Sequence, residues 1–75
     1  MNKKVKFMVG TMDESVPATC RNDEIAELIG VDWGEALTKD QVDAGFFAAH
    51  DIAVSLYGEN GDAFIVYGKS GITVI

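Results

Sequence analysis

The chain has 75 residues, of which 48% are hydrophobic, so it is long enough for one domain with a packed core and unlike a disordered acidic segment. Twelve acidic and six basic residues give a net charge of −6, which disfavours nucleic acids and anionic membranes as direct ligands because both are bound through lysine and arginine. No apolar run approaches the roughly 20 residues of a membrane span, and the single cysteine, Cys20, has no second cysteine for an internal disulfide. We expect a single domain over residues 1–75 in a reducing cytoplasm.

The first part of the chain predicts a strand and a loop. The segment 3–10 alternates between apolar and polar residues, with Val5, Phe7 and Val9 on one side. This alternation is typical of a half-buried strand whose basic side faces water. The segment 11–22 contains the chain's single proline, which disfavours helix before it, so a loop is expected there.

The first predicted helix spans residues 23–29. Asn22 is the expected N-cap, and Gly30 is expected in the left-handed conformation that commonly ends a helix. Helical spacing places Leu28 with the apolar residues on one face, while the acids of the segment occupy the opposite face. The pattern therefore predicts an amphipathic helix with an acidic outer side.

A second helix is predicted from Lys39 to about His50. Thr38 and Gln41 have the spacing of a capping box, in which each side chain binds the backbone N–H of the other residue. His50 would lie in the last turn of this helix, where an imidazolium suits the helix dipole. Phe47 falls on the outer side, away from the apolar stripe.

The last third of the chain predicts three strands. Residues 52–57 and 63–67 are apolar and are separated by Asn60-Gly61, a pair typical of a type I′ hairpin turn. Residues 72–75 would form the last strand. The expected order is β-α-α-β-β-β, an α+β fold in which an antiparallel sheet is covered on one face by two short helices.

Motifs for catalysis and for nucleotide or metal binding are missing from the sequence. A catalytic triad would have to use His50, the only histidine, and its spacing to the serines and the cysteine favours no such site. Glu59, Asn60 and Asp62 resemble part of a calcium loop but lack its twelve-residue ligand pattern. We expect a non-enzymatic protein without cofactor or metal.

The distribution of acidic residues is the main functional signal. All twelve lie between Asp13 and Asp62, where only Arg21 and Lys39 are basic. A surface that serves only solubility normally mixes charges of both signs, although acids at helix starts are also locally favourable. We expect carboxylates along the two helices to imitate the phosphates of a nucleic acid and to bind a basic groove on a nucleic-acid-binding protein. The alternative is that the charge serves solubility alone.

The predicted partner-binding residues are nine acids and two aromatic anchors. They are Asp13, Glu14, Asp23, Glu24, Glu27, Asp32, Trp33, Glu35, Asp40, Asp43 and Phe47. For Phe47, at the centre of the acidic patch, the alternative is packing under the loop 11–22. We expect a monomer, with pairing of Ile72–Ile75 as the alternative route to a homodimer.

The segment 25–31, Ile-Ala-Glu-Leu-Ile-Gly-Val, resembles the first helix and turn of helix-turn-helix proteins. A hairpin over residues 52–67 would then form a wing. The residues that should contact DNA, 32–43, carry several acids and one lysine, whereas base and phosphate contacts use basic or amide side chains. A small regulatory DNA-binding domain is therefore an alternative function, and a phage structural or assembly subunit is another.

In size, acidity and architecture the whole chain resembles the phage-encoded inhibitors of bacterial defence, above all the anti-CRISPR proteins. Several members of that diverse group act as nucleic-acid mimics or block the entry of DNA into a CRISPR effector complex. The resemblance implies an acidic inhibitor that occludes a nucleic-acid-binding surface of a CRISPR effector subunit.

Overall fold

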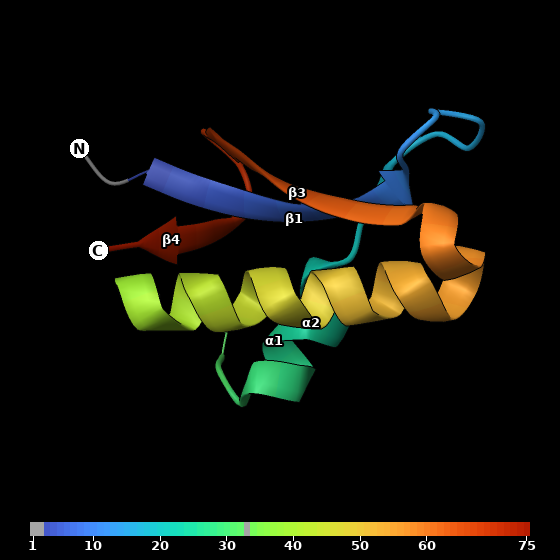
Figure 1. Cartoon of the computed structure of the whole chain (residues 1–75). Helices are drawn as coiled ribbons and strands as arrows, with labels where there is room; N and C mark the ends of the chain where they lie inside the picture. Colours follow the sequence, from blue (N-terminus) through green and yellow to red (C-terminus); the bar gives the residue numbers. More distant parts are fainter. Residues whose placement is uncertain (1–2, 33) are drawn as a thin grey trace.

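The computed structural model describes residues 3–32 and 34–75 (Figure 1). The elements in chain order are β1 (Lys3–Thr11), β2 (Thr19–Cys20), α1 (Asn22–Ile29), α2 (Lys39–Tyr57), the 3-10 turn η1 (Gly58–Asn60), β3 (Gly61–Gly68) and β4 (Ile72–Val74). Over these residues the sheet has four strands, and β2, β3 and β4 all pair antiparallel with β1. Both helices lie on one side of this sheet (Figure 1). The predicted α+β class, an antiparallel sheet with two helices, is confirmed.

Strand β1 lies at the centre of the sheet. On one side β3 pairs with it over its length, from Thr11 opposite Gly61 to Lys4 opposite Gly68. On its other side β1 pairs with two short strands in succession, β2 at one end and β4 at the other. The chain between β3 and β4 passes over β1 at Gly71, which has a φ of 119° and no space for a Cβ against the Val5 carbonyl.

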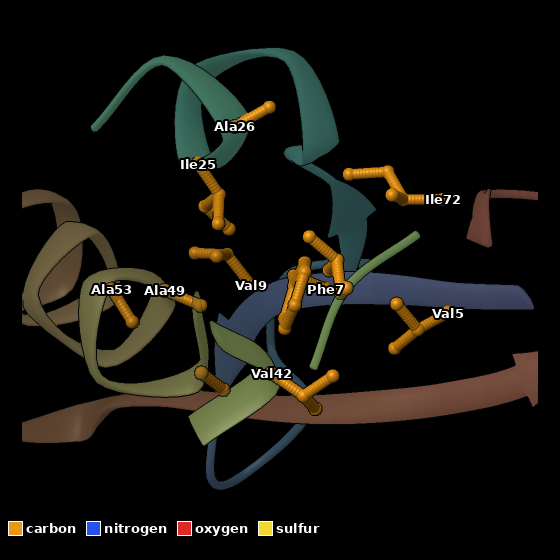
Figure 2. Packing of buried hydrophobic residues seen from close by; sticks show 11 residues of the cluster. Val5, Phe7, Val9, Ile25, Ala26, Val42, Ala49, Ala53 and Ile72 are labelled. Carbon is orange, nitrogen blue, oxygen red and sulfur yellow. The ribbon is translucent and has the colours of Figure 1, made fainter. Parts of the chain in front are cut away.

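The core lies between the sheet and the helices (Figure 2). The predicted alternation of β1 is confirmed, because Val5, Phe7 and Val9 are fully buried. The helices and the other strands cover them with Ile25, Ala26, Val42, Ala49, Ala53, Ala63 and Ile72. Gly45 of α2 lies directly against the Phe7 ring, where no Cβ fits, so α2 packs closely on β1.

The strand predicted over residues 52–57 is wrong, because α2 continues through them to Tyr57. Ala49 and Ala53 are both buried, so the apolar stripe of the helix is maintained for a further turn. The helix has 19 residues and is not short, and His50 lies in its interior rather than in its last turn. The Asn60-Gly61 pair joins η1 to β3 and forms no hairpin.

Of the other three predicted helix ends, two are confirmed and one is wrong. Gly30 has the left-handed conformation with φ 74°, and Thr38 and Gln41 form the complete capping box. Asn22 is the first residue of α1 and not its N-cap, and its side chain turns into the sheet. Its Oδ1 accepts from the Phe7 N–H at 2.8 Å, and its Nδ2 donates to the Val5 carbonyl at 3.1 Å. The amide thus fills the gap that β2 and β4 leave along β1.

The outer edge of β4 is closed by Leu37. The Leu37 N–H donates to the Thr73 carbonyl at 2.8 Å, and the Ile75 N–H donates to the Leu37 carbonyl at 2.9 Å. The alternative of a homodimer through Ile72–Ile75 gains no support, since the outward carbonyl of Thr73 and N–H of Ile75 are already bonded to Leu37. In the part of the chain that the structure describes, no helix combines the length and hydropathy needed to cross a membrane.

Candidate functional site

Four of the predicted partner-binding acids surround one shallow hollow beside α1. Asp23 and Glu27 are one helical turn apart on α1, and Asp32 and Glu35 follow in the next loop. The loop lies against the helix because the chain reverses at Gly30, where the Val31 N–H donates to the Ala26 carbonyl at 2.9 Å. The hollow has a volume of about 490 Å³, and all four side chains are exposed. We call these four residues the acidic hollow.

The acidic hollow has no basic residue among its described lining residues. Asp23 and Glu27 are like charges at i and i+4, an arrangement that destabilises a helix by about 0.2–0.5 kcal/mol. The fold therefore holds carboxylates together without a cation of its own to offset their repulsion. A lysine or arginine brought by a partner would relieve that repulsion.

The opposite side of α1 borders an apolar groove against α2. The groove, of about 480 Å³, is lined by Leu28, Ile52 and Leu56, with Ala48, Ser55, Asp51, Glu24 and Arg21 around them. Leu28 is 65% exposed and lines this groove, whereas Ile25 and Ala26, predicted on the same apolar face, are buried in the core. Glu24 is paired with Arg21 at 2.7 Å at the rim of this groove and is less available to a partner than the acids of the hollow.

The predicted site includes none of the aliphatic residues of the apolar groove, for two reasons. Helical spacing groups Leu28 with the apolar face of the first helix, and the alternation of residues 52–57 predicts a strand. The signal was nevertheless present, since Ala48, Ile52 and Leu56 recur every four residues and form one side of a helix. An uninterrupted helix after His50 would have placed this row beside the first helix.

The acids at the start of α2 and the predicted anchor Phe47 do not line the acidic hollow. Asp40 lies in the first turn of α2, and Asp43 follows one turn later, both exposed. Phe47 is 68% exposed, so the alternative of packing under the loop 11–22 is wrong, and it contacts Phe46 edge to face at a ring distance of 6.2 Å. Trp33, the other predicted anchor, lies outside the described residues.

Asp13 and Glu14 lie at the far end of α2, next to η1. Asn60 Nδ2 donates to Asp13 Oδ1 at 2.9 Å, and the Ser15 N–H donates to the same oxygen at 3.0 Å. These bonds, that from Asn60 above all, hold the pKa of Asp13 well below its ordinary value because they favour the ionised form. Neither Asp13 nor Glu14 lines the acidic hollow.

The basic residues at the start of the chain do not cover the acids. Lys4 and Lys6 lie on the uncovered face of the sheet, opposite to the face that packs on the helices. In residues 3–32 and 34–75, the single ion pair is that of Arg21 with Glu24. Over the same residues, no three Asp, Glu, His or Cys side chains are arranged to hold a metal ion.

Comparison with protein-family models gives no match, and comparisons with curated proteins and with solved structures give no significant match either. The function is therefore inferred from the residues of this chain.

Proposed function

We propose that the chain is a non-enzymatic binding protein. The carboxylates of its acidic hollow would bind a basic, nucleic-acid-binding surface of a larger protein and so cover that surface. A nucleic-acid-binding subunit of a CRISPR effector complex is the proposed partner, and occlusion of its DNA is the proposed effect. The observation that carries the proposal is the convergence of Asp23, Glu27, Asp32 and Glu35 around one hollow without a basic lining residue among those described. Such an array presents lysine and arginine side chains with several carboxylates at once.

The apolar groove supplies the second part of the proposed interface. Leu28 projects from α1 between the groove and the acids, and 65% of its surface is exposed. Protein interfaces are held by a few apolar anchors surrounded by polar residues. Charged residues of α1 would then determine the rate and orientation of binding, while Leu28 and Leu56 would add affinity.

The helix-turn-helix alternative gains no support from the geometry. Residues 30–38 separate α1 from α2, whereas the motif joins its helices with a turn of about 3–4 residues. The predicted wing is wrong as well, since residues 52–57 belong to α2. We therefore retain the protein-binding proposal.

Fluorescence anisotropy of a labelled DNA duplex tests the proposal with purified CRISPR effector complexes. The chain should lower DNA binding by the effector, and it should give no shift with the duplex alone at about 50 mM salt. The double variant Asp23→Lys/Glu27→Lys should weaken this inhibition at least about tenfold, because two attractive contacts become repulsive.

The matched control is Glu14→Lys/Glu59→Lys, which changes the net charge by the same amount at exposed positions that do not line the acidic hollow. It should change inhibition by less than about threefold, through long-range charge alone. Equal losses in the two double variants would show that only net charge matters. A duplex shift by the chain itself would favour the DNA-binding alternative.

A further inference from the structure

Strand β3 forms an open edge of the sheet. On β1, the Phe7 N–H and carbonyl are bonded to Asn22 and Arg21 on the side away from β3. The backbone N–H and carbonyl groups of successive residues point to opposite sides of a strand, so those of Lys6 and Met8 point toward β3. They form hydrogen bonds with the backbone groups of the residues opposite them, Val66 and Phe64. Ala63, Ile65 and Tyr67 therefore point their backbone groups outward, and among the described residues no strand pairs with that edge.

The open edge is long and apolar. β3 has eight residues without proline, and its one charged residue is Asp62. Phe64, Val66 and Tyr67 are 44%, 43% and 53% exposed. Natural edge strands are normally protected by charges, prolines, bulges or a covering element. The local protection here is the Asp62 carboxylate, which accepts from the Ala63 N–H at 2.9 Å.

A row of α2 residues lies on the same side of the molecule as this edge. Asp43, Phe47, His50 and Val54 recur at helical spacing and are all exposed, with Phe47 at 68% and Val54 at 43%. The other flank of α2 faces α1 across the apolar groove. Because α2 packs under β1 and β3 (Figure 1) and α1 lies on its other flank, helical spacing turns this row toward the β3 side of the molecule. Exposed apolar side chains from two elements thus adjoin one set of unpaired backbone groups.

We propose that a second copy of this chain binds at the β3 edge, so that β3 pairs antiparallel with itself about a twofold axis at Ile65. The two sheets then become one continuous sheet, and the outward N–H and carbonyl groups of Ala63, Ile65 and Tyr67 are bonded. Pairing at this register places the small Ala63 opposite the large Tyr67 of the second copy. It also places Phe64 opposite Val66 of the second copy on the uncovered face, which buries two exposed apolar residues against each other.

The charges near the edge are also complementary under this twofold axis. Asp62 at one end of β3 comes next to Lys69 beyond the other end of the second β3, because the strands are antiparallel. Ile65 is opposite Phe7 of β1, and Phe7 packs on Gly45 of α2, so Ile65 and Gly45 are at about the same height along the strands. A twofold axis through Ile65 therefore passes the exposed side of α2 close to residues 46 and 47. Asp43 then faces His50 of the second copy, and Phe47 approaches its own counterpart.

The proposed dimer leaves the acidic hollow free. The hollow is formed by α1 and the loop after it, on the flank of α2 that is turned away from β3. The two hollows would lie on the outer flanks of the dimer. The inference does not depend on the proposed function, and each can fail without the other.

Light scattering after size-exclusion chromatography, together with sedimentation equilibrium, measures the mass of the wild-type chain. Twice the monomer mass is expected at concentrations of about 10–100 μM. The amide hydrogens of Ile65 and Tyr67, which face solvent in a monomer, should exchange at least about tenfold more slowly at high concentration than after dilution. A monomer mass at 1 mM, about the highest concentration useful here, would overturn the proposal.

Two double variants distinguish the β3 edge from other contacts. Both carry Val66→Glu, which places the new carboxylate opposite Lys6 of its own chain and so keeps the monomer stable. Phe64→Lys/Val66→Glu pairs opposite charges across the proposed axis, whereas Phe64→Glu/Val66→Glu pairs like charges. The dissociation constant should be at least about tenfold higher for the second variant.

Circular dichroism confirms that both double variants remain folded before their masses are compared. A complementary variant that dimerises and a like-charge variant that does not would support the register centred on Ile65. Equal dissociation constants for the two variants would overturn it, because that outcome means that residues 64 and 66 do not face each other. A wild-type dimer with fast exchange at Ile65 and Tyr67 would place the interface elsewhere.

Discussion

The two sides of the sheet are completed in different ways. Along β1, the strands β2 and β4 leave a gap that the Asn22 side chain fills, and Leu37 bonds the outer side of β4. Along β3, the outward backbone groups of Ile65 and Tyr67 face no other strand within the described part of the chain, and they lie beside exposed Phe64, Val66 and Tyr67. One edge is therefore closed by the fold itself, and the other is available for association.

The comparison shows that an edge can be closed without a continuous strand. An asparagine side chain carries a carbonyl oxygen that accepts and an NH2 group that donates, so it can replace the carbonyl and the N–H of a peptide unit. At position 22 it takes the place of the strand residue that is missing between β2 and β4. Since Asn22 is also the first residue of α1, it couples the start of that helix to the centre of the sheet.

Replacing Asn22 should have the largest effect on stability. The side chain is 2% exposed, and Asn22→Leu leaves the Phe7 N–H buried without a partner. The Val5 carbonyl loses the bond from Asn22 but still faces Ile72 of β4 within the sheet. An unpaired buried N–H costs about 1–3 kcal/mol and a lost hydrogen bond about 0.5–1.5 kcal/mol, so a loss of about 2–4 kcal/mol is expected in the free energy of unfolding. Chemical denaturation monitored by circular dichroism measures it.

The control for Asn22 is Asn60→Ala. Asn60 also donates a side-chain hydrogen bond, to Asp13, but that bond is exposed to water. Its loss should lower the free energy of unfolding by less than about 1 kcal/mol. Similar losses for the two variants would mean that burial of the Asn22 amide is not what closes this edge.

Proline substitutions on β3 compare bonded and open backbone positions directly. The backbone N–H of Val66 donates to Lys6, so Val66→Pro removes a hydrogen bond of the sheet. The backbone N–H of Tyr67 points outward, so Tyr67→Pro removes no hydrogen bond of the sheet. Val66→Pro should therefore be less stable than Tyr67→Pro by about 1–3 kcal/mol when both are measured as monomers in denaturant. Equal stabilities would show that the assigned alternation of β3 is shifted by one residue. Tyr67→Pro should also weaken the proposed dimer.

The sequence is sufficient to predict the elements whose local signals agree with one another. The alternation of β1, the capping box of Thr38 and Gln41, and the left-handed Gly30 all follow from local geometry. The segment 52–57 was misassigned because Ile-Ala-Val-Ser-Leu-Tyr satisfies an alternating pattern as well as a helical one. What decides in favour of helix is the burial of Ala53 against the sheet, a tertiary contact that no short window contains.

The candidate site was predictable to a similar extent. Spacing alone places Asp23 and Glu27 on one outer face of the first helix, and the structure confirms this. That Asp32 and Glu35 join them depends on the path of the loop after Gly30. The bonding of Asp13 to Asn60 joins residues far apart in the sequence and depends on α2 ending at Tyr57, so it could not be inferred before the fold was known.

The smallest expected effect concerns this bond between Asp13 and Asn60. Folding lowers the pKa of Asp13 below its unfolded value of about 3.9, so its contribution to stability is present above that pH and is lost as the pH falls below it. Carbon-detected NMR titration of Asp13 in the wild type and in Asn60→Ala separates the contribution of Asn60 from that of Ser15. The Asp13 pKa should rise toward its ordinary value in Asn60→Ala, since the bond that lowers it most is then missing. An unchanged titration would mean that Asn60 does not bind Asp13 in solution and that the loop 12–18 is not attached to η1 through this pair.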